Sequence, residues 1–272
     1  MGTSDIVSII IIATTCFVSY KGFKSSNFYA SLEFEVEKIL LYKDYKRLVT
    51  SGFIHVNWQH LLFNMISLFF FSFNLEAVLN PVKFLVLYFA SLVGGNLVAL
   101  FIHQKNPSYA SVGSSAAVNG LIFASITLFP GLHIFFMPGW LFGLIFILYS
   151  IYGIRSRKDN IGHETHLGGA LIGMLTAIAF HPAALSENTI PIILMFLPTV
   201  AFMIIIITKP QLLFVDNYWF THKYNYTVDD RYNAKKKNTQ QEVDRILDKI
   251  NQRGINSLSR SERESLKEYS KK

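Results

Sequence analysis

Charged residues are scarce in this sequence. Only 16% of its 272 residues are Asp, Glu, Lys or Arg, whereas 51% are hydrophobic and the mean hydropathy is +0.34. A soluble globular domain typically has about a quarter of its residues charged. The composition therefore excludes an ordinary soluble domain and predicts a polytopic integral membrane protein.

Cysteine and acidic residues are also few. Cys16 is the only cysteine, so no disulfide within the chain is possible. The N-terminus lacks the basic segment and cleavage site of a signal peptide, so we expect no cleavage there. Acidic residues number 18 against 25 basic ones. Much of this excess lies in the C-terminal part, where basic residues next to a membrane favour anionic lipids over nucleic acid as partners.

Long apolar segments are abundant. A transmembrane helix needs about 20 mostly apolar residues. Seven segments come close to this length, and they are Ile6–Tyr20, Gln59–Leu79, Val82–His103, Gly113–Phe129, Leu132–Gly153, His163–Phe180 and Ile190–Ile207. We therefore expect an all-α membrane core over residues 1–182, which contains six helices, and a seventh transmembrane helix within 183–208.

The C-terminal part differs in character from the core. Residues 209–238 read as a polar linker. In the following segment, 239–272, Val243, Ile246, Leu247 and Ile250 have helical spacing. Gly254 is a stop signal, and Ser259 with Glu262 forms a capping box. We predict a small helical module there.

Three clusters of polar residues open apolar segments, where each needs an explanation. His60 and Asn64 are four residues apart and share one helix face. In GSSAAVNG, Ser115 stands in a first helical turn, where free N–H groups could stabilise an oxyanion. His166 lies just before Gly169 and Gly173, a GxxxG pattern that lets another helix approach closely. Helix packing alone could also explain the first two clusters. Solvation at the membrane interface could explain a histidine near a helix end, and it suits His163 better than His166.

The alternation of the segments adds a spatial argument. The N-terminal ends of the second, fourth and sixth segments lie on one side of the membrane if every segment crosses it. His60, Asn64, Ser115 and His166 then lie at similar depth. A serine nucleophile needs a base and oxyanion donors, and these residue types supply both.

At this point residues 45–180 resemble the rhomboid intramembrane serine proteases. The quoted motifs are TSGFIHVNWQHLLFNM, GSSAAV and THLGGALIG. The resemblance implies a rhomboid-like six-helix core with Ser115 as nucleophile and His166 as base. It also implies that His60 and Asn64 help form the oxyanion hole. The C-terminal segment is similar to a module on rhomboid-like proteins of Bacteroidetes-type bacteria.

The resemblance further implies an enzyme, a serine endopeptidase that cleaves transmembrane protein substrates near a helix end. No cofactor and no metal are expected. Glu164 is on a different helix face from His166, so we expect a Ser-His dyad without a third carboxylate. The implied location is a multi-pass position in a bacterial inner membrane. The family's usual orientation places the N-terminus in the cytoplasm and the active-site end outside. The distribution of basic residues favours the opposite orientation, with the active-site end in the cytoplasm.

Two alternatives remain open. The family usually has glycine after the nucleophile and an aromatic residue four positions on, whereas this chain has Ala116 and Asn119. A pseudoprotease that binds transmembrane helices without cleavage is therefore one alternative. The other is a metal transporter or metalloprotease, with ligands from His55, His60, His163, Glu164 and His166. HETH lacks the HExxH spacing that places two histidines on one helix face.

Overall fold

The computed structural model divides the chain into two compact units, Met1–His222 and Lys223–Lys272. In the first unit the structure describes residues 6–156 and 161–208. In the second unit it describes residues 243, 245–250, 254, 257–259, 262, 263, 266 and 269. The predicted linker 209–238 lies outside the described residues.

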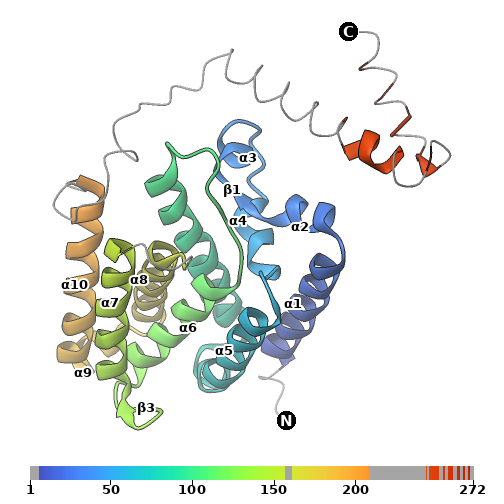
Figure 1. Cartoon of the computed structure of the whole chain (residues 1–272). Helices are drawn as coiled ribbons and strands as arrows, with labels where there is room; N and C mark the ends of the chain where they lie inside the picture. Colours follow the sequence, from blue (N-terminus) through green and yellow to red (C-terminus); the bar gives the residue numbers. More distant parts are fainter. Residues whose placement is uncertain are drawn as a thin grey trace. The chain divides into compact units, whose positions relative to one another are not determined.

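Apolar helices dominate the first unit (Figure 1). They are α1 (Ile6–Lys24), α5 (Trp58–His103), α6 (Ser115–Leu128), α7 (Gly139–Ser156), α8 (His163–Phe180) and α10 (Thr189–Thr208), with the short α9 (Ala184–Glu187) before the last. Among the described helices, α1, α5 and α10 are long and apolar enough to cross a membrane, whereas α6 and α7 are shorter. The predicted all-α membrane fold is confirmed.

Helix α5 consists of two helices joined at a kink. Asn80 has a φ of 61° and a ψ of 163°, and Pro81 follows it. The Asn80 side chain accepts hydrogen bonds of 3.1 Å from the backbone N–H groups of Val82 and Lys83. Asn80 thus caps a new helix whose first residue is proline, a favoured arrangement. The two halves match the predicted segments Gln59–Leu79 and Val82–His103.

The predicted start of the fifth apolar segment at Leu132 is wrong. Residues after Leu132 form a hairpin of β3 (His133–Ile134) and β4 (Met137–Pro138), and α7 begins only at Gly139. Phe135, in the turn, has a φ of 57°, which a helix does not permit. The hairpin escapes detection because its residues continue an apolar run.

The first loop contributes one strand to a small sheet that the sequence pattern does not predict. The loop consists of α2 (Ser26–Leu32), β1 (Phe34–Glu35), α3 (Val36–Leu40), α4 (Arg47–Thr50) and the 3-10 helix η1 (Ser51–Phe53). Strand β1 pairs antiparallel with β2 (Ala110–Ser111), which precedes α6. Phe34, Val36 and Ile39 are fully buried. The first loop is therefore packed onto the connection that leads to Ser115.

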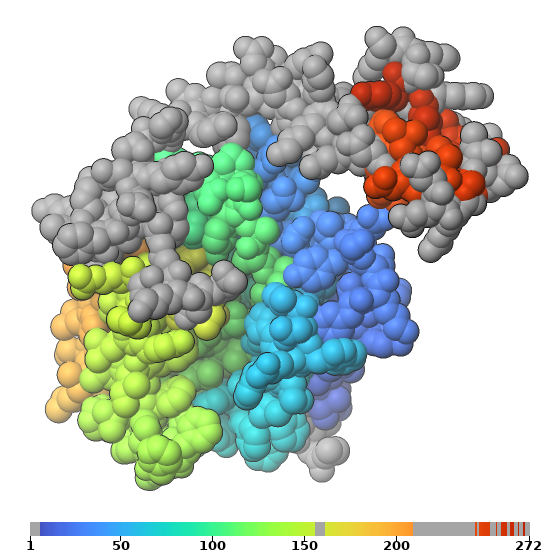
Figure 2. Space-filling view, viewed as in Figure 1, coloured from blue at the N-terminus to red at the C-terminus, as the bar shows by residue number. Residues whose placement is uncertain are grey.

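Glycines bring α5, α6 and α8 into backbone contact. A Cβ atom at Gly169 would collide with the carbonyl oxygen of Ala116, and one at Gly173 with that of Gly120. At Gly95 of α5, a Cβ would lie 2.8 Å from the Ala116 methyl group. Small residues at membrane helix interfaces permit such close approach. Figure 2 shows α6 in the recess between the start of α5 and α7.

The second unit contains helical residues at 245–250, and Gly254 ends this turn with a φ of 76°. The Gly254 N–H donates to the Ile250 carbonyl at 2.8 Å, a typical helix C-terminal arrangement. Val243 and Ile246 are buried, as their spacing predicts. Leu247, which shares the helical spacing, is 45% exposed.

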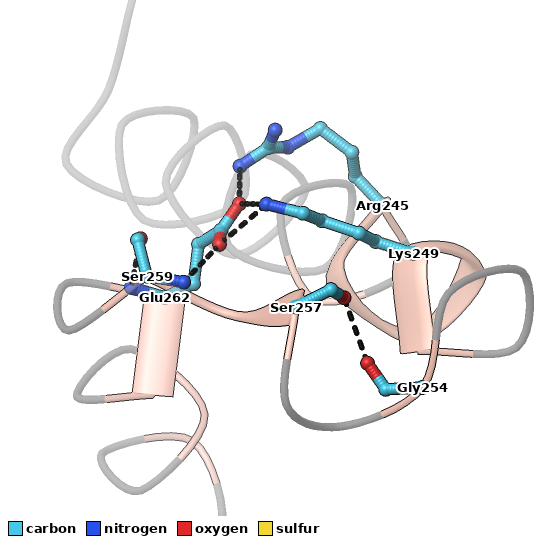
Figure 3. Close-up of polar contacts among 6 residues, drawn as sticks. All are labelled: Arg245, Lys249, Gly254, Ser257, Ser259 and Glu262. Atoms are coloured by element: carbon cyan, nitrogen blue, oxygen red, sulfur yellow. Dashed lines mark hydrogen bonds and ion pairs between the residues drawn. The ribbon is translucent and has the colours of Figure 1, made fainter.

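The capping box in this unit is formed by Ser259 and Glu262 (Figure 3). The Ser259 N–H donates to Glu262 Oε2 at 2.7 Å, and the Glu262 N–H donates to Ser259 Oγ at 3.2 Å. Lys249 Nζ donates to both carboxylate oxygens, at 2.9 and 2.8 Å. The Glu262 carboxylate therefore links two helical turns of the unit. The boundaries of the predicted module stay a prediction.

Candidate active site

Ser115 occupies a tight turn at the start of α6. The turn depends on Gly113, which has a φ of 120° and donates its N–H to the Ser51 carbonyl at 2.9 Å. Glycine adopts this left-handed conformation without strain. A Cβ at Gly113 would also lie 2.6 Å from Cε1 of His60. The turn therefore needs glycine for two reasons, and it brings the α6 N-terminus next to the His60 ring.

The Ser115 hydroxyl meets His166 of α8. Ser115 Oγ and His166 Nε2 are 2.8 Å apart, although 51 residues separate them in sequence. Both side chains are half-buried. The backbone contacts at Gly169 and Gly173 hold α8 against α6 one to two turns further along. A serine within hydrogen-bond reach of a histidine is the geometry of an activated nucleophile.

His60 and Asn64 lie close to this pair but in different surroundings. Asn57 caps α5 by accepting the His60 N–H at 2.8 Å. His60 lines the same cavity as Ser115 and His166, which has a volume of about 800 Å³. Asn64 is 6% exposed and donates to the His60 carbonyl at 2.9 Å. It lines a second, adjacent cavity.

The second cavity, of about 660 Å³, is a mostly apolar groove between the start of α5 and α7. Phenylalanines from both helices line it, together with the polar side chains of Asn64 and Asn119. Asn119 donates to the Ser115 carbonyl at 2.8 Å. The groove therefore reaches the turn of α6 that carries Ser115.

His55 is a further residue at the site, which the spacing of motifs does not identify. It is fully buried, with Nδ1 3.0 Å from Ser19 Oγ, and the Ser114 N–H donates to Nε2 at 3.3 Å. Burial first, and the nearby His60 second, lower the pKa of His55 to about 3. A neutral His55 therefore accepts from the residue before Ser115 and fixes that turn against α1. Its partners are distant in sequence, so no local signal reveals it.

Ala116, at the position where the resemblance leads us to expect glycine, packs against α5. Ala116 is 1% exposed, and its methyl group faces Gly95 of α5. Ala116 lines neither of the two cavities above. Gly95 provides the space that the additional methyl group occupies.

His163 and Glu164 are candidate ligands of the alternative metal site, and the structure gives them other contacts. His163, which as a histidine near a helix end would be expected at a hydrated interface, is 2% exposed, and its ring meets Tyr149 edge-on. Glu164 contacts His103 rather than His166. Within 6–156, 161–208 and the described C-terminal residues, no three His, Cys, Asp or Glu side chains lie close enough to hold a metal ion.

Comparisons with known proteins agree with this architecture. The rhomboid domain model matches residues 42–183, more than half of the chain. Residues 226–272 match a family of unknown function (DUF6576). The rhomboid match spans both loops and helices that carry the motifs, from the first loop to the end of α8.

Several curated proteins are similar over part of their length. RHOMBOID-like protein 12, mitochondrial, of Arabidopsis thaliana is 30% identical over 47% of this chain and 44% of its own length. Rhomboid protein 1, mitochondrial, of Saccharomyces cerevisiae is 31% identical over 50% and 43%. Rhomboid protease AarA of Providencia stuartii is 28% identical over 53% and 59%. The chain thus spans about half the length of these relatives, and by its domain match it belongs to the rhomboid family.

Proposed function

We propose that this protein is an intramembrane serine endopeptidase that cleaves transmembrane protein substrates through a Ser115–His166 dyad. The observation that carries the proposal is the distance of 2.8 Å between Ser115 Oγ and His166 Nε2. This contact joins two helices at the wall of a cavity of about 800 Å³, which polar side chains such as His60 help to line. Water can therefore reach the pair, as hydrolysis requires.

In the proposed reaction, Ser115 Oγ attacks the carbonyl carbon of the scissile peptide bond while His166 Nε2 takes its proton. His166 then gives this proton to the leaving amine, and an acyl-enzyme remains on Ser115. Water attacks the ester, again with His166 as base, and a carboxylic acid is released. This sequence is the general two-step mechanism of serine hydrolases.

The negative charge of the tetrahedral intermediate needs donors. The N–H of Ser115 at the α6 N-terminus and the side chains of His60 and Asn64 are the proposed ones. The ring of His60 lies against Gly113, two residues before the nucleophile. The Asn64 amide donates to the His60 carbonyl, so a substrate must replace that contact. Removal of one oxyanion donor typically lowers kcat about 10²–10³-fold.

The groove between α5 and α7 suits an apolar helical segment. Its phenylalanines offer an apolar wall, and Asn64 and Asn119 offer polar contacts near the nucleophile. We infer that a transmembrane substrate lies there and presents an unwound segment to Ser115. A multi-pass position in a bacterial inner membrane remains part of the proposal, and relatives of the chain include a bacterial rhomboid protease and mitochondrial proteins.

The test uses the purified full chain in liposomes with a model transmembrane substrate. We expect cleavage by the parent protein and none above background by Ser115→Ala. Ser114→Ala is the matched control, because Ser114 is a buried neighbouring hydroxyl that contacts His55 instead of His166. Equal cleavage by Ser115→Ala would show that Ser115 is not the nucleophile.

An activity probe separates a protease from a pseudoprotease. A fluorophosphonate reacts covalently with an activated serine, and we expect it to label the parent and Ser114→Ala but not Ser115→Ala. A parent protein that binds transmembrane helices without labelling would favour the pseudoprotease. The position of the Ala116 methyl group, against Gly95 and away from both cavities, supports the active enzyme.

A further inference from the structure

A buried carboxylate lies two residues before His166 and has no part in the reaction above. Glu164 is 6% exposed in the first turn of α8. Its Oε1 atom accepts a hydrogen bond of 2.6 Å from the Tyr109 hydroxyl and lies 2.8 Å from Nε2 of His103. Because an ionised carboxylate only accepts hydrogen bonds, both partners act as donors. We call these three residues the Glu164 cluster.

The cluster is held together by more than its hydrogen bonds. The rings of His103 and Tyr109 are stacked, with centroids 3.5 Å apart and an angle of 10° between their planes. Burial first, and the Glu164 charge second, raise the pKa of Tyr109 well above its ordinary value of 10. Tyr109 therefore remains a donor. Burial of a carboxylate is unfavourable unless its partners are in place, so the three groups stabilise one arrangement.

The members of the cluster come from three separate segments. His103 ends α5, Tyr109 lies just before β2, and Glu164 opens α8. The Tyr109 carbonyl also accepts the Val36 N–H at 3.1 Å, and its ring meets Phe34 edge-on. The cluster therefore joins the β1–β2 sheet of the first loop to the helix that carries His166.

The turn that carries Glu164 also carries His166. Side chains two residues apart on a helix point about 200° apart, so Glu164 faces the end of α5 while His166 faces Ser115. Gly162, the cap residue of α8, has no side chain with which to fix this turn. A rotation of the turn that breaks the Glu164 contacts must also move His166 relative to Ser115.

We propose that Glu164 is a positioning residue for His166, and that the Glu164 cluster couples the first-loop sheet to the base of the dyad. This inference rests on the proposed function, because it concerns the same reaction. Its energetic basis is the steep dependence of rate on geometry: a displacement of about 1 Å can lower a rate about 10²-fold. The cluster and the dyad line the same cavity, and Glu164 bonds with Tyr109 and His103.

The first test compares Glu164→Gln with Glu37→Gln in liposomes with the transmembrane substrate. Glu37 is a half-buried carboxylate of α3 that belongs to neither the cluster nor the walls of the two cavities. We expect Glu164→Gln to lower kcat about 10-fold to 100-fold, with KM within about threefold of the parent. Glu37→Gln should retain the parent kcat. A Glu164→Gln kcat equal to that of Glu37→Gln would overturn the inference.

A second variant covers the case in which Glu164→Gln does not fold. Tyr109→Phe removes only the hydroxyl that donates to Glu164 and keeps the stacked ring. We expect it to lower kcat while KM and the thermal unfolding midpoint stay near those of the parent. A parent-like kcat would overturn the inference, and so would a loss of activity that merely follows the loss of folded protein.

Amide hydrogen exchange tests the coupling without any need for activity. In a folded Glu164→Gln or Tyr109→Phe protein, exchange should accelerate together in residues 107–111 and in 162–168, and it should not do so in Glu37→Gln. Acceleration of neither segment, or of one alone, would overturn the coupling. If the parent protein cleaves nothing, the proposed function fails, and the exchange result still decides whether the cluster links the two segments.

Discussion

Helix α10 is more apolar than helix α6, yet α6 is the more deeply buried of the two. Every residue of α6 from Ala116 to Leu128 is buried, although α6 is too short to qualify as a spanning helix. The most apolar 18 residues of α10 have a mean hydropathy of 2.8, yet only 33% of them are buried. It lies at one edge of the first unit, beside α7 (Figure 1). In a membrane the most apolar helix can therefore face lipid, while polar and small residues occupy the interior.

The reason is that lipid is as apolar as leucine, so hydrophobicity does not drive helices together there. Close packing and hydrogen bonds select the interior positions instead. Helix α8 illustrates this, because its first turn carries two histidines and a glutamate, and its glycines contact the α6 backbone. Helix α10 carries no ionisable side chain.

The largest expected difference between the α6–α8 contact and α10 is the loss of unfolding free energy when a side chain is enlarged. Gly173→Ala places a methyl group against the Gly120 backbone, which has no room for it. We expect a loss of about 3 kcal/mol or more in unfolding free energy, at the upper end of the usual cost of overpacking. The matched control is Ala201→Val on the exposed face of α10, with an expected change within about 0.5 kcal/mol.

The measurement is the thermal unfolding midpoint of each variant in the same detergent. For a unit of this size, 1 kcal/mol corresponds to about 2–4 °C. If Gly173→Ala and Ala201→Val shift the midpoint equally, α6 and α8 do not approach each other as closely as the structure shows.

The second difference is in pH dependence. The pKa of the buried His55 is about 3, below its ordinary value of 6.5. The unfolded chain therefore binds a proton between these values that the folded chain does not bind. Stability is full above pH 6.5 and decreases as the pH falls toward 3, by at most about 1.4 kcal/mol per pH unit.

His55→Gln should remove this part of the pH dependence, which amounts to about 2 kcal/mol between pH 6.5 and 5. His133→Gln is the matched control, because His133 is exposed on β3. Thermal midpoints measured from pH 7.5 to 5 give the slope for each protein. A parent slope that survives in His55→Gln would assign the pH dependence to another group.

Local signals predict much of this fold but only part of the site. Asn80 and Pro81 mark the break within α5, and the bounds of α8 follow from its apolar segment between polar residues and proline. Ser115 at the start of α6 follows from its place at the start of an apolar run. These features depend on residues that are close in sequence, so composition and spacing reveal them.

Other features depend on pairs that are distant in sequence. His55 meets Ser114 across 59 positions, and Glu164 meets His103 across 61. Strands β1 and β2 have two residues each, too few for an alternating pattern. The predicted pairing of His60 with Asn64 on one helix face does not reveal that the two line different cavities. Only the three-dimensional packing contains this information.

The smallest expected effect comes from the charge of Glu262 in the second unit. This unit differs from α6 and α10 in that a carboxylate holds its turns together. Lys249 and the Ser259 N–H, as hydrogen-bond donors, lower the pKa of Glu262 to about 2 from its ordinary value of 4.5. Its contribution to the stability of the second unit is full above pH 4.5 and is lost as the pH falls toward 2.

Glu262→Gln should increase amide exchange at residues 259–263 several-fold at pH 7 and leave the thermal midpoint of the first unit unchanged. Ser257→Ala is the control, because Ser257 contacts only the Gly254 carbonyl among the contacts drawn in Figure 3. If the midpoint of the first unit falls in Glu262→Gln, the two units unfold together and the second unit has no separate stability.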